Sequence, residues 1–278
     1  MTVIVVTDAS AALGAEGFAA AGIAVLPLHI LTSAGEFLDD GSPLPTECFV
    51  ADGITTSGPA PGEVRAVLDA ALARSGGDGV VAVVMSSHLS STYSVTSSVA
   101  DQIGGPITVI DSRSIDMALG FAVLEAVRVA ATGAPREEVA EAAHAVLAES
   151  EGYFCAATLE HLRAGGRVSV VAALLGGALS IVPVLRIADG RIATVRKTRT
   201  VARARTQVTD LAVAHAGEAP ARMAVHHVTA PAAAEAVAAE LRRRVPALEQ
   251  LVVGSFGGTI AAHLGPGALG VSVAPVRP

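Results

Sequence analysis

Short runs of β-branched and aliphatic residues that end in polar turns constrain the fold of this chain most. The strongest run, Gly79–Met85, reads GVVAVVM and is followed at once by the polar segment Ser86–His88. Similar runs occupy 3–7, 25–30 and 107–110. Runs that are short and apolar throughout are typical of strands buried on both faces of a sheet. We therefore expect each of these runs to form a buried strand.

Helical patterns separate these runs. Apolar residues recur at helical spacing over 62–73, 92–102, 116–131 and 135–149. Strands that alternate with helices predict a doubly wound, mostly parallel sheet of the α/β class. Ligands bind such sheets at the carboxyl ends of the strands. In this chain those ends carry Asp8 and Ser10, Ser86–Ser91, and Asp111 and Ser112.

The pattern changes after about residue 150, and we expect two lobes that pack closely. They are an N-terminal α/β domain over 1–150 and a C-terminal mixed α/β domain over 151–278. The pair Asp189–Gly190 predicts a hairpin turn in the second domain. The other elements expected there are strands over 154–159, 221–226 and 251–254 and helices over 200–215 and 231–244.

Composition narrows the class of partner. The chain has 26 acidic and 19 basic side chains and a formal net charge of −7, which argues against nucleic acid as a partner. Hydrophobic residues make up 51% of the chain, but aromatic residues only 3%. We therefore expect any cleft to be lined by aliphatic side chains, which favour a flexible hydrocarbon over stacked rings as ligand.

The sequence also predicts a location. Cys48 and Cys155 form no C-x-x-C pair, so neither a metal site nor a redox pair is expected, and reduced thiols suit the cytoplasm. No signal peptide is expected, because Asp8 interrupts the first apolar run and no basic segment precedes it. The uncharged run 168–185 approaches the length of a membrane span, but two glycines and a proline interrupt it. We expect this run to be buried core.

Hydroxyl groups gather at two helix starts. Ser86–Tyr93 places several of them, with a histidine, in a turn between a buried strand and a helix, and the positive end of a helix dipole favours anions there. Thr55–Ser57 forms a second cluster ahead of Pro-x-Pro. Ordinary helix capping explains the second cluster alone, whereas together the two indicate one anion site. His263, ahead of Gly-Pro-Gly, is suited to donate to a carboxylate.

Basic residues mark a second feature. Gly165, Gly166 and Arg167 stand immediately before the uncharged run, and a cation at the mouth of an apolar segment suits a ligand with an apolar body and an anionic end. Seven bases lie within the twenty residues 186–205. They form either a solvated surface or a face for a phosphate-bearing or acidic partner.

Taken in order, these residues resemble the DegV family of bacterial fatty-acid-binding proteins along nearly the whole chain. The motifs that carry the resemblance are Thr7, Asp8 and Ser10; Pro27 and Leu28; Phe37–Asp39; Thr56–Pro59; Ser86–Tyr93; Asp111 and Ser112; Thr158–Arg167; and His263–Gly267. Ser91 stands where the family usually has glycine.

The resemblance implies a two-lobed α/β protein with a long-chain fatty acid between the lobes. It implies that Thr56, Ser57, Ser90 and His263 hold the carboxylate, with Ser91 and Thr92 as further residues of the head-group loop. It further implies that the protein presents this carboxylate to a separate fatty acid kinase subunit, which brings ATP and Mg²⁺ and forms the acyl phosphate. Arg167, Lys197 and Arg199 are then the residues expected to dock the kinase, and this chain itself needs no cofactor or metal.

Two other functions stay open. Ser90 and His263 are residue types that a serine-dependent hydrolase of lipids or esters would use, although nothing in the sequence marks one serine as an activated nucleophile. The protein could also bind lipid without any kinase partner. Transient contact with a membrane surface is open in the same way.

Overall fold

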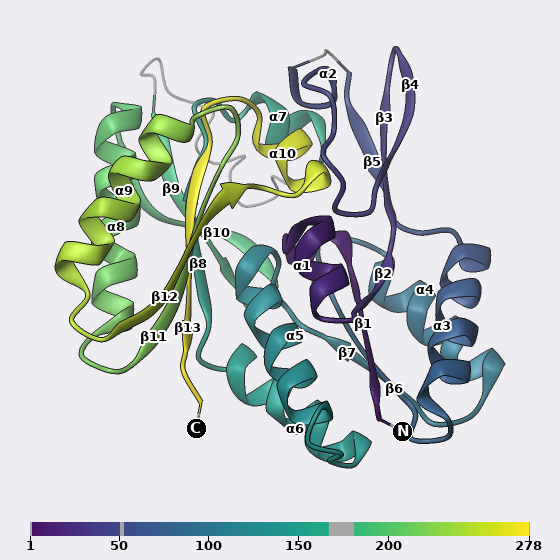
Figure 1. Cartoon of the computed structure of the whole chain (residues 1–278). Coiled ribbons are helices and arrows are strands. Elements are labelled where there is room, and N and C mark those ends of the chain that lie inside the picture. The colour runs from purple at the N-terminus through teal and green to yellow at the C-terminus, as the bar shows by residue number, and fades with distance from the viewer. Residues whose placement is uncertain (1, 51–52, 167–180, 278) are drawn as a thin grey trace.

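The computed structural model describes residues 2–50, 53–166 and 181–277 of the chain. Figure 1 shows the two halves of the chain side by side, with the C-terminal half on the left and the helices α5 and α6 low between them. The architecture is mixed α/β, with a parallel sheet in the first half and a mixed sheet in the second.

The first sheet is four-stranded, entirely parallel and ordered β2-β1-β6-β7. Val5 and Val83 face one side of it, and Val6 and Ala82 face the other, because successive side chains alternate along a strand. Helices cover both faces, so the central strands β1 and β6 are buried throughout, whereas the edge strand β7 is mostly half-buried. The prediction of a doubly wound parallel sheet is thus confirmed. The strands are β1 (Ile4–Asp8), β2 (Ala24–Leu26), β6 (Val80–Val84) and β7 (Ile107–Asp111).

The helices of this half lie close to the predicted ranges. One face of the sheet carries α3 and α4, and the other carries α1, α5 and α6. The short helix η1 (Ala9–Ala11) follows β1. The bounds are α1 (Gly14–Ala20), α3 (Pro61–Ser75), α4 (Thr92–Ile103), α5 (Asp116–Ala130) and α6 (Arg136–Leu147).

A third, small sheet was not predicted. Its antiparallel order is β4-β3-β5, and the helix α2 (Glu47–Val50) lies in the connection between β4 and β5. The expectation of one strand over 25–30 is wrong, because the run is divided between β2 and β3 at Pro27, which has no N–H to donate to a ladder. The bounds are β3 (Leu28–Thr32), β4 (Gly35–Asp39) and β5 (Thr55–Ser57).

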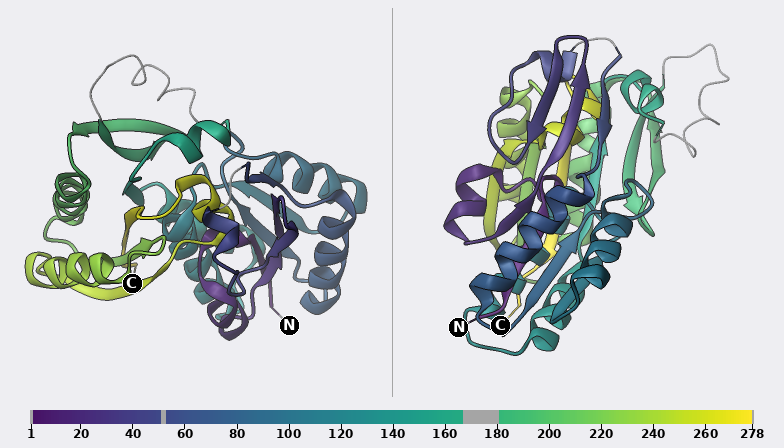
Figure 2. Two further views of the ribbon diagram at one scale, coloured as in Figure 1. Left: turned by 90° about the horizontal axis from the view of Figure 1, so that it is seen from above. Right: turned by 90° about the vertical axis from the view of Figure 1, so that its right-hand side faces the viewer.

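The second large sheet is six-stranded, with the order β10-β9-β8-β13-β11-β12. All its neighbouring strands are antiparallel except β11 and β12. The helices α8 and α9 cover its outer face, and its inner face looks toward the first half (Figure 2). The strands are β8 (Glu151–Cys155), β9 (Val182–Ala188), β10 (Arg191–Thr198), β11 (Ala221–His227), β12 (Leu248–Ser255) and β13 (Leu269–Pro275).

The helices α8 (Val201–Ala216) and α9 (Pro231–Arg244) agree with the prediction, as does the hairpin turn at Asp189–Gly190. The strand expected over 154–159 is displaced, because β8 ends at Cys155. Thr158 instead lies two residues before α7 (Glu160–Ala164), and its Oγ1 accepts the Glu160 N–H at 3.2 Å. The helix α10 (Gly258–Leu264) and the strand β13 were not predicted.

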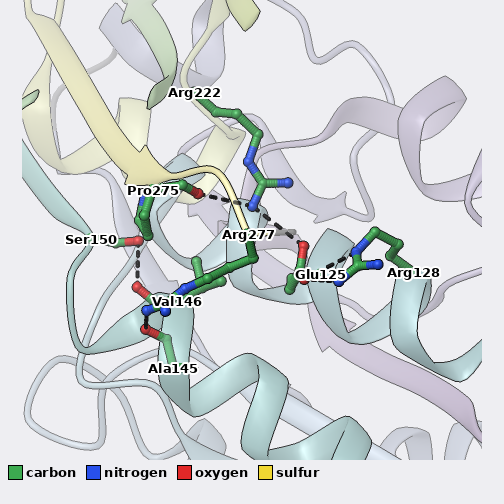
Figure 3. A network of polar contacts seen from close by, with 8 residues as sticks. All are labelled: Glu125, Arg128, Ala145, Val146, Ser150, Arg222, Pro275 and Arg277. Carbon is green, nitrogen blue, oxygen red and sulfur yellow. Dashed lines mark hydrogen bonds and ion pairs between the residues drawn. The ribbon is translucent and has the colours of Figure 1, made fainter. Parts of the chain in front are cut away.

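The two halves share a buried interface built on α5. Phe121 and Ala122 of α5 pack with Ala224 of β11 and Ala274 of β13. Below them, Glu125 is 3% exposed and accepts hydrogen bonds from Arg128 of its own helix and from Arg222 of β11 (Figure 3). The boundary at residue 150 falls between α6 and β8. Whether the halves are separate domains stays a prediction.

Within the described residues, no helix has both the length and the apolar character needed to cross a membrane. The uncharged run 168–185 lies mostly outside the described residues, and its end, Val182–Leu185, belongs to β9.

Candidate ligand-binding site

A cavity with about 850 Å³ of unoccupied space, part of it open to solvent, lies between the two halves. Aliphatic and aromatic side chains make up most of its wall, so the cavity suits an apolar ligand. These side chains are Leu28, Met85, Leu89 and Ile115 from the first half and Phe154, Leu162, Ile187, Ile192, Phe256, Ile260 and Leu264 from the second.

Two strand glycines lie on the cavity wall, and one of them, Gly152, gives the cavity part of its space. Gly152 of β8 and Gly270 of β13 both line it from the inner face of the large sheet. A methyl group at Gly152 would meet nothing closer than Ser272 Oγ at 3.7 Å. Glycine weakens a strand, and inside one it often marks the close approach of another group. Sequence analysis missed both glycines, although each interrupts an apolar strand.

One end of the cavity is polar, and Thr56 and His263 meet there. Thr56 Oγ1 lies 2.8 Å from His263 Nε2, across 207 residues of sequence. Thr56 comes from the small sheet and His263 from α10, so the pair joins the two halves of the chain. A side chain at Gly165 would overlap the His263 ring, which explains the first glycine of the pair before Arg167.

Ser90 and Thr92 form the second polar pair. Their hydroxyl oxygens are 2.8 Å apart, and the Thr92 backbone N–H donates to Ser90 Oγ at 3.2 Å at the start of α4. Gly58 lies directly above them, because a methyl group there would be 3.2 Å from Thr92 Oγ1 and 3.4 Å from Ser90 Oγ. The absence of a side chain at Gly58 therefore keeps the segment after β5 close to these hydroxyls.

The other head-group candidates are placed differently. Ser57 borders the cavity, but it follows Thr56 along β5, so its side chain starts from the opposite face of that strand. Ser91 is exposed and lies ahead of the first residue of α4. A methyl group at Gly58 would be 3.5 Å from Ser91 Oγ, so Ser91 stands at the rim.

Two of the three candidates for partner docking, Lys197 and Arg199, are not among the residues that line the cavity. Lys197 is exposed on β10, an edge strand of the large sheet, and Arg199 is exposed just after it. Arg167 lies outside the described residues. The docking roles of all three stay predictions.

The polar residues at the carboxyl ends of the strands contribute unequally to the cavity. Ser90 of the 86–91 loop lines the cavity, whereas Asp8 and Asp111 do not. The Asp8 carboxylate accepts the Ser10 N–H at 2.9 Å and the Met85 N–H at 2.7 Å, and burial raises the pKa of Asp8. Asp8 therefore has a structural role, joining the ends of β1 and β6.

Sequence analysis missed a buried polar group on the cavity wall. Asp116 and Ser272 line the cavity, and the Ser272 hydroxyl donates to Asp116 Oδ2 at 2.9 Å. Asp116 Oδ1 lies 2.6 Å from Nδ1 of His226, which is 2% exposed. These residues are 110 or more positions from Asp116 in the chain, so no local motif indicated them. Among the described residues, no group of three or more His, Cys, Asp or Glu could hold a metal ion.

Comparison with known proteins places this fold and cavity in a family. The family model described as "Uncharacterised protein, DegV family" matches residues 2–276. A DegV domain-containing protein of Mycobacterium tuberculosis is 42% identical over 273 residues, which cover 98% of this chain and 97% of that protein.

Solved structures agree. A DegV family protein from Thermus thermophilus, described by its fatty acid binding, superposes with a TM-score of 0.91 at 28% identity and covers 99% of this chain and 100% of its own. DegV from Bacillus subtilis, described as a fatty acid binding protein, has a TM-score of 0.88 at 28% identity, with the same coverage. The chain studied here belongs to the DegV family.

Proposed function

We propose that this protein binds a long-chain fatty acid in the cavity and presents its carboxylate to a separate kinase subunit, which converts it to an acyl phosphate. The observation that carries the proposal is a largely apolar cavity that Thr56, His263 and Ser90 line, with Thr56 paired to His263 and Ser90 paired to the buried Thr92. The fatty acids bound by the Thermus and Bacillus relatives support the same ligand class.

The hydrocarbon tail supplies most of the affinity in this proposal. Each buried CH₂ group contributes about 0.8 kcal/mol, so a long chain gains on the order of 10 kcal/mol before the costs of association. A hydrogen bond to the charged carboxylate contributes about 1.5–3 kcal/mol. The tail therefore sets how tightly the ligand binds, and the polar end sets how it is oriented.

The hydroxyl pairs can present two donors to a carboxylate. If His263 Nε2–H donates to Thr56 Oγ1, the Thr56 hydroxyl proton is available to a ligand oxygen. If the Thr92 hydroxyl donates to Ser90 Oγ, the Ser90 proton becomes available in the same way. Each donor is then polarised by the group behind it.

Hydroxyl donors also suit a carboxylate that must react. No arginine or lysine is among the described residues that line the cavity. A bidentate arginine would hold both carboxylate oxygens and block attack by either. With neutral donors, one oxygen can attack the γ-phosphorus of ATP on the kinase, and ADP leaves as the acyl phosphate forms.

The kinase subunit would bring the ATP and the Mg²⁺, and docking through Arg167, Lys197 and Arg199 belongs to the proposal. The cytoplasm is the compartment we expect for this protein.

Hydrolysis by Ser90 is the weaker candidate, because Ser90 Oγ pairs with Thr92 and His263 Nε2 pairs with Thr56, so Ser90 and His263 are not arranged as nucleophile and base.

Lipid analysis of the purified protein tests the proposal. We expect native mass spectrometry to show one fatty acid per chain and expect the Gly152→Leu variant, whose added side chain enters the cavity, to lose long-chain ligands. Gly62→Leu is the matched control, because Gly62 has open space around it and lies outside the cavity. Equal lipid content in wild type and Gly152→Leu contradicts the assigned cavity.

The kinase step is tested with a fatty acid kinase subunit, ATP and Mg²⁺. Acyl phosphate formed only when this protein is present supports the presenting role. A lipid-loaded protein that never yields acyl phosphate limits the function to lipid binding. Covalent labelling of Ser90 by a fluorophosphonate would instead favour the hydrolase.

A further inference from the structure

His29 lies next to the polar end of the cavity without lining it. It stands on β3 directly opposite Ser57 of β5, and its neighbour Ile30 is opposite Thr56. Side chains alternate along a strand, so His29 points to the face of the small sheet opposite to that of Ile30 and Thr56. The His29 side chain is 13% exposed, and the motifs of the sequence analysis left it without a role.

Two glutamates engage both ring nitrogens of His29. His29 Nδ1 is 2.7 Å from Glu36 Oε1 of β4, and Nε2 is 2.9 Å from Glu63 Oε2 of α3. An ionised carboxylate only accepts hydrogen bonds, and a neutral imidazole has a single N–H. The contact with Glu63 is a hydrogen bond, and both contacts are ion pairs when His29 is an imidazolium cation.

The state of the glutamates supports the cation. The N–H of Ala60 and the contact with His29 lower the pKa of Glu63, although burial opposes them. Glu36 is 60% exposed, so water solvates its carboxylate. Glu63 is therefore the acceptor in its hydrogen bond with His29, and the His29 ring supplies the proton.

Glu63 carries the effect of His29 to the head-group segment 57–60. Its Oε2 also accepts the Ala60 N–H at 2.7 Å, at the first turn of α3. The segment is thus held at one end by the pairing of Ser57 with His29 and at the other by Glu63. Gly58, in the middle, is the residue that lies over the hydroxyls of Ser90 and Thr92.

We propose that protonated His29 is a positioning residue, which through Glu63 holds segment 57–60 over Ser90 and Thr92 and so fixes the orientation of the bound carboxylate. The proposal rests on the proposed binding of a fatty acid in this cavity. Its consequence concerns orientation: the tail stays bound without His29, but the carboxylate no longer occupies one place.

The test uses the full chain and oleic acid labelled with ¹³C at the carboxyl carbon. We expect wild type to give one sharp bound carboxyl resonance, and His29→Leu and Glu63→Gln to broaden it or shift it toward that of free oleate. Oleate affinity should change less than about threefold, because the tail dominates binding. His29→Lys, which restores a cation with several donors, should recover the sharp resonance.

Imidazole ¹⁵N spectra at neutral pH supply the direct readout, where we expect both nitrogens of His29 to be protonated. Leu31→Ala, on the same outer face of β3, is the control and should leave the oleate resonance unchanged. An unchanged resonance in His29→Leu, or a singly protonated ring in wild type, overturns the positioning role. A wild-type protein that binds no oleate sinks the proposed function as well, whatever the ¹⁵N spectrum shows.

Discussion

A side chain at Gly165 would overlap the imidazole of His263, and one at Gly265 would overlap that of His161. The two histidines come from α7 and α10, which pack together, and each ring occupies the space left by a glycine near the other. The position of His263 against Thr56 therefore depends on the absence of a side chain at Gly165.

We expect Gly165→Ala to displace His263 from Thr56. Overpacking of this kind costs about 1–3 kcal/mol of unfolding free energy. Chemical denaturation measures the loss, and Gly62→Ala, at a position with open space, is the control that should lose none. A Gly165→Ala protein as stable as wild type would show that the ring has room to move.

Ser90→Ala and His263→Ala test the head-group roles. Ser90→Ala removes a hydrogen bond to the carboxylate of about 1.5–3 kcal/mol, and His263→Ala removes the group that orients the Thr56 hydroxyl. Both variants leave the tail pocket intact, so fatty acid should still co-purify. In the kinase assay that tests the proposed function, acyl phosphate formation should fall, because the carboxylate loses its orientation. If either variant supports turnover at the normal rate, the residue replaced in it has no role in orienting the carboxylate.

The short helix α10, which carries His263, depends on an aspartate from the small sheet. Asp39 of β4 is 1% exposed and accepts the Thr259 N–H in the first turn of α10 at 2.6 Å. Burial raises the pKa of the Asp39 carboxyl above 3.8, and the hydrogen bond from the Thr259 N–H reduces that rise. The folded protein therefore holds a proton on Asp39 more tightly than the unfolded chain does.

Linkage gives the sign of the pH dependence. Between 3.8 and the folded pKa of Asp39, the folded state binds more protons, so the stability due to this group rises as pH falls and is lost as pH rises through the folded pKa. The Asp39→Asn variant has no carboxyl at this position, so its stability lacks this dependence on pH. Urea unfolding across this pH range should show the free energy of unfolding of wild type rising relative to that of Asp39→Asn as pH falls. A difference between the two free energies that does not change with pH would contradict the raised pKa of Asp39.

The two halves of the molecule are held together by polar groups as well as by the packing on α5. Glu125 is 3% exposed and contacts Arg128 on one oxygen and Arg222, from the other half, on the second (Figure 3). Arg222 also donates to the Pro275 carbonyl at 3.2 Å and lies over the Phe121 ring at 5.6 Å. One buried carboxylate therefore joins the helix α5 to the large sheet.

We expect Glu125→Gln to destabilise the whole molecule by about 3 kcal/mol, because it leaves Arg222 without its buried counter-charge. Glu137→Gln removes a carboxylate from an exposed pair with Arg136 and should have a much smaller effect. Thermal and urea unfolding of the two variants measure the difference. Equal stability of the two would show that Glu125 does not hold the halves together.

The parallel sheet was predictable from the chain alone. A run such as Val80–Val84 is apolar on both faces, so it leaves water only when both faces are buried. The run alone therefore indicates a strand in the interior of a sheet. Thr56, Ser90 and His263 could be proposed as site residues because their motifs are local and occur in the order of a known family.

Tertiary structure decided the remainder. The strands β4 and β5 are short and largely exposed, so no apolar pattern indicated them. The contact of Thr56 with His263, the open space at Gly152 and the two glutamates around His29 each depend on residues far apart in the chain. The type of a residue determines which hydrogen bonds and ion pairs its side chain can make. Which group it meets is decided by the tertiary fold, because packing against a distant segment brings the two side chains together.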